Sequence, residues 1–243
     1  MEYIGWKGVI FSTSCLSIVA SILMMAIKIT IKKNNENSLK IKWHVIKRVL
    51  KKKNLLVNTG YAGHTWELYA MWAWIGPFLV YYYGVQGLEQ MEAIRYGNIT
   101  GALVLMVGGI ATYVGGKLSD QYGHIKVANI FLFISISCSI MIGWLDSVPL
   151  IVMFIVLFIY GFSIVADSPI YNVAITNVSD PEVMGLALGV QSVIGFSVTI
   201  FSPMIFGFLL ESFSWGVAFM VIGLVTIISP ICMLVLKKEQ ASS

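Results

Sequence analysis

Long apolar stretches separated by short polar connections set the pattern of this chain. A helix needs about 20 mainly apolar residues to cross the hydrocarbon core of a membrane. Seven stretches reach that length, and they cover residues 8–27, 55–83, 96–116, 127–144, 148–177, 183–210 and 214–236. The pattern therefore predicts an all-α membrane protein with seven transmembrane helices.

The composition supports lipid as the solvent of this chain. Of its 243 residues, 58% are hydrophobic and 12% are charged, which leaves too little polar surface for a water-soluble domain of this size. The net charge of +4 does not indicate nucleic-acid binding, because the basic residues gather in a loop between apolar stretches. The three cysteines and three histidines are scattered, so we expect no metal site, and no cofactor is required.

The positions of lysine and arginine predict the direction of each span, because basic loops stay on the cytoplasmic side. Ten of the sixteen basic residues lie between Lys28 and Lys53, and alternate crossing from there places four more on the same side: Lys117, Lys126, Lys237 and Lys238. Only Lys7 and Arg95 fall on the other side. We therefore expect a plasma or inner membrane protein with its N-terminus outside and its C-terminus in the cytoplasm. Three tryptophans at outer span ends agree with this: Trp6, Trp144 and Trp215.

The basic loop after the first span leaves two interpretations open. Residues 38–53 interleave apolar side chains with lysines, which is typical of an amphipathic helix lying on anionic lipid. A solvated linker accounts for the same composition. The first span itself is expected to be a retained helix rather than a secretory signal, because its basic cluster follows the apolar core instead of preceding it.

Ionisable residues within apolar spans are costly, so they usually face a cavity or a partner. Glu67 and Asp167 are the two carboxylates in such positions, and His64 precedes Glu67 by three residues, on the same helix face. The spacing suggests a titrating pair of His64 and Glu67, suited to coupling transport to protons. The alternative is that Glu67 bonds to a neighbouring helix and His64 is a packed interior residue.

Asp167 is followed by Ser168 and Pro169, and the proline removes a backbone donor. We expect a kink or break there, of the kind that forms sites near the membrane midplane in transporters. A position near the cytoplasmic mouth is the alternative for Asp167. Asn172 and Gln191 are weaker polar candidates for a substrate or coupling role.

Other classes of membrane protein also have seven helices. A retinal protein needs a lysine in its last helix, but residues 214–236 contain no charge. A signalling receptor, or a structural membrane protein without transport activity, stays an alternative. Metalloprotease chemistry needs a second histidine four residues after the first, which His64 lacks, so an enzyme is not expected.

A short polar loop carries a family resemblance. The stretch GGKLSDQYGHIK resembles the loop signature of the major facilitator superfamily, with Gly116, Asp120, Gly123 and Lys126 at the signature positions. Gln121 stands where the pattern usually has a basic residue, as in the weaker copy in the second half of such transporters. The stretches WELYAMWAW, ADSPIYN and SDPEVMGLALGVQS are similar to the family as well, although Met184 replaces a common arginine.

The resemblance implies the second half of a secondary transporter with twelve helices. Residues 1–30 correspond to the sixth helix, 31–54 to the central cytoplasmic loop, 55–238 to a six-helix half built as an inverted repeat of two three-helix units, and 239–243 to a tail. The four signature residues then form a cytoplasmic gate. The resemblance implies a small solute as substrate, and we expect Glu67 or Asp167 to couple its movement to protons. It also implies either a gene fragment or a split half, the latter with a separately encoded N-terminal half as partner.

Overall fold

The computed structural model describes residues 5–26 and 43–242 of the chain. The first half of the predicted basic loop, residues 31–42, lies outside these residues, as does the side chain of Trp6. The chain divides into two units, residues 1–40 and residues 41–243. Each unit is described by itself.

The first unit contains one helix, α1 (Gly5–Ala26), which is apolar and long enough to cross a membrane from Lys7 to Met25. Its hydroxyl side chains bond to carbonyls one turn earlier: Ser12 Oγ donates to Gly8 O at 2.8 Å, and Ser21 Oγ to Ser17 O at 2.8 Å. Such bonds satisfy polar groups within the helix, as a lipid environment requires.

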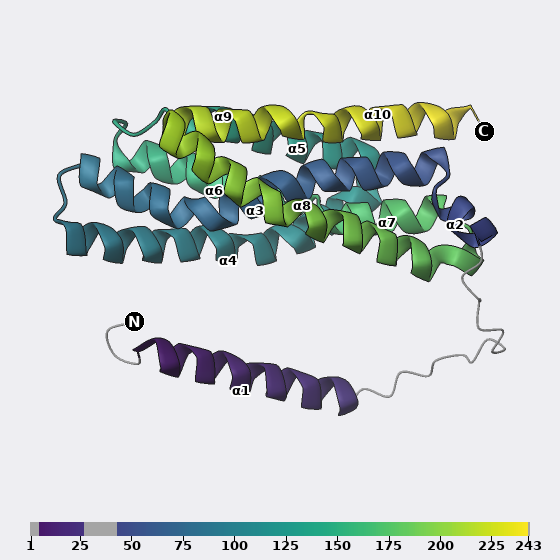
Figure 1. The fold of residues 1–243 in the computed structure, drawn as a ribbon, viewed down its shortest axis with the longest axis horizontal. Helices are drawn as coiled ribbons and strands as arrows, with labels where there is room; N and C mark the ends of the chain where they lie inside the picture. The colour runs from purple at the N-terminus through teal and green to yellow at the C-terminus, as the bar shows by residue number, and fades with distance from the viewer. Residues whose placement is uncertain (1–4, 27–42, 243) are drawn as a thin grey trace. The chain divides into compact units, whose positions relative to one another are not determined.

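The second unit is an all-helical bundle whose long helices lie roughly along one common axis (Figure 1). They are α2 (Trp43–Val49), α3 (Lys52–Val85), α4 (Gln90–Tyr122), α5 (His124–Ile142), α6 (Leu150–Ala166), α7 (Ser168–Val178), the 3₁₀ turn η1 (Pro181–Val183), α8 (Met184–Ser212), α9 (Trp215–Thr226) and α10 (Ile228–Ala241). The structure confirms the expected all-α architecture.

Two of the spans are broken, each just before a proline. Asp167 separates α6 from α7 ahead of Pro169, which confirms the break predicted there. Ile227 separates α9 from α10 ahead of Pro230, a break that was not predicted. Proline removes the hydrogen bond to the preceding turn and its ring crowds that carbonyl, so the helix is interrupted within a turn.

The packing of the bundle repeats between its two halves. Helix α3 packs on α8 as α6 packs on α4, and α3 packs on α10 as α6 packs on α5, while α5 meets α9. The contacts therefore repeat when α3 is matched with α6–α7, α4 with α8, and α5 with α9–α10. Because each set crosses three times, the second set runs in the opposite direction, which is the predicted inverted repeat of two three-helix units.

Six of the seven predicted spans are long and apolar enough to cross a membrane: residues 7–25, 90–122, 124–142, 150–178, 181–212 and 215–241. The predicted span 55–83 lies in α3, which has 34 residues but is not one of these six. Buried polar side chains, among them Asn58, His64 and Glu67, interrupt its apolar run. Helix α3 packs closely against α4, α8 and α10, and it also meets α9, α7 and α6.

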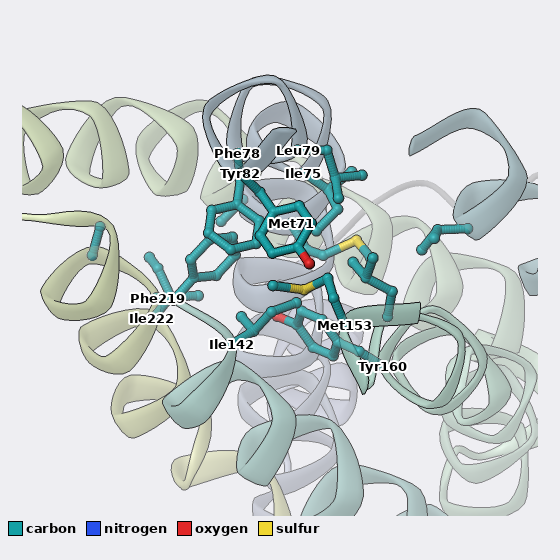
Figure 2. Packing of buried hydrophobic residues seen from close by; sticks show 14 of the residues in the cluster. Met71, Ile75, Phe78, Leu79, Tyr82, Ile142, Met153, Tyr160, Phe219 and Ile222 are labelled. Carbon is teal, nitrogen blue, oxygen red and sulfur yellow. The ribbon is translucent and has the colours of Figure 1, made fainter. Parts of the chain in front are cut away.

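The apolar core forms two clusters of buried side chains along α3. The larger cluster joins Met71, Ile75, Phe78 and Tyr82 of α3 to side chains of the other helices, and Figure 2 shows its packing. Phe78 and Phe219 meet edge to face, with ring centroids 5.3 Å apart. The second cluster lies toward the end of the bundle that contains α2, and it includes the buried Val49. Between them lies a group of polar residues.

Candidate functional site

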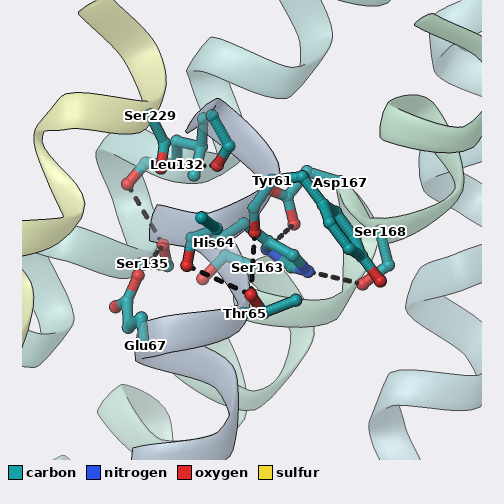
Figure 3. Close-up of polar contacts among 12 residues, drawn as sticks. Tyr61, His64, Thr65, Glu67, Leu132, Ser135, Ser163, Asp167, Ser168 and Ser229 are labelled. Atoms are coloured by element: carbon teal, nitrogen blue, oxygen red, sulfur yellow. Dashed lines mark hydrogen bonds and ion pairs between the residues drawn. The ribbon is translucent and has the colours of Figure 1, made fainter. Parts of the chain in front are cut away.

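A buried pair of ionisable side chains joins α3 to the break between α6 and α7. His64 Nδ1 lies 3.1 Å from Asp167 Oδ1, and the two side chains are 2% and 1% exposed. The other ring nitrogen, His64 Nε2, lies 2.9 Å from Ser168 Oγ (Figure 3). Both nitrogens of the imidazole are therefore engaged by the broken helix.

This arrangement corrects the pairing that the sequence suggested. His64 and Glu67 share a helix, but the partner of His64 is Asp167, more than one hundred positions further along the chain. With one nitrogen at Asp167 and the other at Ser168, the ring has no nitrogen left for Glu67. The spacing of three residues places His64 and Glu67 on one face of α3, but they do not bond to each other.

The contact between His64 and Asp167 is close but not aligned as a hydrogen bond. Within the described residues, neither carboxylate oxygen of Asp167 has a hydrogen-bond donor. A buried carboxylate without donors is costly, and a nearby imidazole offsets only part of that cost. The pair is therefore sensitive to any change of charge or position at the break.

Two tyrosines close the space around His64. The Tyr171 ring stacks on the imidazole with centroids 5.4 Å apart and 29° between planes, and the Tyr61 ring lies 6.1 Å away. Tyr171 also fits tightly against Gly60, where an added Cβ would lie 3.1 Å from the tyrosine ring. These contacts fix the orientation of the imidazole toward the break.

Helix α10 approaches α3 closely at the same level. Ser229 Oγ donates to Gly60 O at 2.8 Å, and an added Cβ at Gly63 would collide with Ser229 Oγ. The break before Pro230 places Ser229 at the start of α10. Both broken spans therefore meet α3 beside His64.

Glu67 lies near the middle of α3 and is 1% exposed. Its Oε2 accepts a hydrogen bond from Ser135 Oγ of α5 at 3.1 Å, and its Oε1 has no partner among the described residues. Ser135 Oγ is also 3.1 Å from Leu132 O. Since a hydroxyl has one hydrogen, it serves either Glu67 or Leu132 at a given time, so the carboxylate is only partly satisfied.

The other candidates divide between the interior and the surface. Gln191 of α8 is buried, and its Nε2 donates to Tyr171 O at 3.3 Å, which links it to the histidine site. Asn172 lies exposed on α7 and contributes no contact to the interior cluster. Asn58 was not predicted, yet it is buried with neither side-chain atom bonded in the described structure. Its only sequence signal was an amide within an apolar span.

The predicted gating residues lie at the connection of α4 to α5. Gly123 has φ +92°, a conformation that glycine adopts readily, and this accounts for the glycine in the signature. Asp120 and Lys126 are exposed, and Gly116 is half-buried. Asp120 forms no ion pair in the described part of the chain. A role of this loop as a gate stays a prediction.

A cluster of ion pairs at the α2 end of the bundle was not predicted. Arg48 Nε and Lys51 Nζ lie 3.0 Å and 2.9 Å from Asp180 Oδ2, and Arg48 Nη1 lies 2.8 Å from Glu182 Oε2. The hydrogen bond from Lys51, with that from Arg48, holds the pKa of Asp180 below its ordinary value. The cluster joins the start of α3 to the connection between α7 and α8.

These ion pairs predict a dependence of stability on pH and salt. A carboxyl whose pKa is lowered by folding stabilises the fold above its ordinary pKa, which is 3.8 for this group, and loses that effect as the pH falls through the lowered pKa. We expect Asp180→Asn to lower the midpoint of thermal unfolding at pH 7 and low salt. The difference from the unmodified chain should shrink in acid and at high salt. Asp120→Asn is the control, and an equal effect of that change would contradict the assignment.

Comparison with known proteins assigns this chain to a family. An inverted-repeat bundle of apolar helices around buried ionisable groups is typical of secondary transporters. The family model of the Major Facilitator Superfamily matches residues 1–203, so the chain belongs to that superfamily. This is a superfamily of membrane transporters, not of enzymes.

A solved structure with a similar fold is described as the crystal structure of an auto-inhibited POT family peptide transporter. The TM-score is 0.68 at 16% sequence identity, over 77% of this chain. This chain spans 37% of the length of that protein. The likeness shows a shared fold. Among curated proteins, no sequence matches this chain significantly.

Proposed function

We propose that this chain supplies one half of a secondary active transporter that moves a small solute together with protons. The observation that supports this best is the His64–Asp167 pair, buried at a helix break with unsatisfied carboxylate oxygens. A proton added to or removed from such a pair changes the balance of charge where two repeats meet. That change provides a physical link between protonation and movement of the helices.

In this proposal Glu67 is the second protonatable group of the same pathway. It lies on α3 one turn from His64, and a single shared hydroxyl at Ser135 stabilises it incompletely. Gln191 would link the position of α8 to the protonation of the site through its hydrogen bond to the carbonyl of Tyr171. Asn172 is retained as a candidate on the surface of α7, where a second half would meet it.

The exposed face of α3 supports a second half-bundle as partner. Trp72 is 41% exposed, and Tyr69 lies beside it with ring centroids 5.4 Å apart. Tyr69 also meets Phe196 of α8 edge to face. Aromatic rings with polar edges suit a solute cavity between halves better than a lipid face. We propose that residues 55–238 form one half of the carrier, and that an N-terminal half supplies the other wall of the cavity.

The remaining parts follow the family plan. Residues 1–30 would act as the last helix of the first half and residues 31–54 as the central loop on the cytoplasmic side. We propose a plasma or inner membrane location with the N-terminus outside. The loop containing Gly116, Asp120, Gly123 and Lys126 would close the cytoplasmic side when the cavity opens outward.

Transport in liposomes tests this proposal. The chain, alone and together with a candidate N-terminal half, is reconstituted into vesicles loaded with a pH-sensitive dye. Amino acids, sugars, nucleosides and dipeptides are then added outside. We expect solute-dependent acidification only when both halves are present. Robust solute uptake by the chain alone, or uptake by both halves without proton movement, would contradict the requirement for a second half or the coupling, respectively.

A further inference from the structure

A groove on the outside of the bundle runs between α5 and α10. Two cavities adjoin there, of about 330 Å³ and 390 Å³, and both are lined by Ile125, Lys126 and Lys237. The two cavities differ in chemistry. One lies at the end of the helices, and the other continues along their apolar sides.

The cavity at the helix ends is basic. Lys126 and Lys237 contribute ammonium groups from the two helices, and His124 adds an imidazole. Within the described structure, neither lysine forms an ion pair or a hydrogen bond. The rest of the wall is partly polar, from Tyr122, Asn177 and Gln240, and partly apolar, from Ile125, Ala174 and Leu236. Two uncompensated cations facing one cavity favour an anionic group there.

The start of α5 strengthens this preference. Its N-cap residue is Gly123, which has no side chain to cap the first backbone N–H groups. Residues 123–125 line the same cavity as the lysines, so the positive end of the helix dipole lies beside it. The backbone and side chains of α5 offer complementary partners for phosphate oxygens.

The adjoining cavity is apolar and faces outward. It is lined by Ile130, Phe133 and Ile134 of α5 and by Leu234 of α10. Phe133 is 72% exposed and Leu234 is 51% exposed, so the groove opens to the surroundings of the bundle. In a membrane-spanning protein, those surroundings at this depth are acyl chains.

We propose that this composite groove binds an anionic phospholipid, with its phosphate between Lys126 and Lys237 and an acyl chain along Phe133 and Leu234. A free phosphate would use only the basic cavity, and a neutral lipid only the apolar one. The continuity of the two cavities across shared residues favours a molecule that has both parts. Basic pockets between transmembrane helices are suited to such headgroups.

The position of the groove gives the lipid a structural role. Helix α5 belongs to the first three-helix unit and α10 to the second, so a bound lipid bridges the two repeats. Lys126 also belongs to the predicted gating loop. Binding of the lipid would therefore favour the arrangement of the two units in which Lys126 and Lys237 face one cavity.

Native mass spectrometry of the purified full chain tests the proposal. The probes are dioleoylphosphatidylglycerol, dioleoylphosphatidylcholine with the same acyl chains, and inorganic phosphate. We expect the anionic phosphatidylglycerol to remain bound in preference to the zwitterionic phosphatidylcholine. At roughly 1 kcal/mol per lysine, Lys126→Gln with Lys237→Gln should weaken retention about 30-fold. The matched control, Lys117→Gln with Lys238→Gln, removes the same charge outside the groove and should retain the lipid.

Three results would overturn the proposal. The first is equal retention of the two lipids by the unmodified chain, a comparison that does not depend on any variant folding. The second is an equal loss in both double variants, which would show a general effect of charge. The third is displacement of the lipid by millimolar phosphate, which would assign the basic cavity to a free anion.

Discussion

Replacing Asp167 by asparagine is expected to abolish proton-coupled transport in the complete carrier and to destabilise the bundle. The amide keeps the size of the side chain but removes its charge and its ability to take up a proton. With His64 protonated, removing the carboxylate leaves a buried cation uncompensated, at a cost of about 3 kcal/mol. His64, which is 2% exposed, has no other acidic partner in the described structure. Thermal unfolding of the purified chain measures this loss.

A double-mutant cycle separates the pair from a general effect of the break. If His64 and Asp167 stabilise one another, the combined change of His64→Gln with Asp167→Asn should cost less than the sum of the single changes. Asp120→Asn serves as the control, because Asp120 is exposed and forms no ion pair within the described chain. Additive effects, or a higher unfolding midpoint for Asp167→Asn, would show that the two side chains are not paired.

The spans and the break at Asp167 were predictable because their causes are local. An apolar run of bilayer length must become a helix in lipid, since every backbone group has to be satisfied within the segment. Pro169 acts within one turn of its own position, so its effect on Asp167 was visible in the sequence. The inverted repeat followed from the family resemblance and from the odd number of crossings in each unit.

The partners of the polar side chains were not predictable, because they depend on which helices meet. His64 of α3 contacts Asp167 at the break between α6 and α7. Glu67 of α3 accepts a hydrogen bond from Ser135 of α5, a residue that nothing distinguishes from others in its apolar run. The same holds for Arg48 of α2 and Asp180 of the connection between α7 and α8, which lie far apart in the chain. Helix periodicity gives the face of a residue, whereas its partner requires the arrangement of all six spans.

Helix α3 shows how the two levels combine. Its polar residues lowered its hydropathy below that of the other spans, and the same residues explain why it lies at the centre of the packing. A helix that carries Asn58, His64 and Glu67 is stable in a membrane only when other helices shield these groups from lipid. The carrier's candidate coupling residues and its structural centre therefore lie on the same element.

Glu67→Gln is expected to have the opposite effect on stability from Asp167→Asn. Glu67 has no cationic partner in the described bundle, and its Oε1 has no donor. An amide of the same shape can still accept the hydrogen bond from Ser135 Oγ, and it removes the cost of an unpaired buried carboxylate. We expect the free energy of unfolding to rise by about 1–2 kcal/mol, while proton-coupled solute uptake by the complete carrier is lost.

This combination distinguishes a functional carboxylate from a structural one. A residue that holds the fold together destabilises it when changed, whereas a residue retained for proton transfer leaves the fold equal or more stable. Glu211→Gln, at an exposed position of α8, controls for the loss of one negative charge and should change neither property. If Glu67→Gln lowered the unfolding midpoint and left uptake and its pH dependence unchanged, Glu67 would be a packing residue. Proton coupling would then have to rest on the His64–Asp167 pair alone.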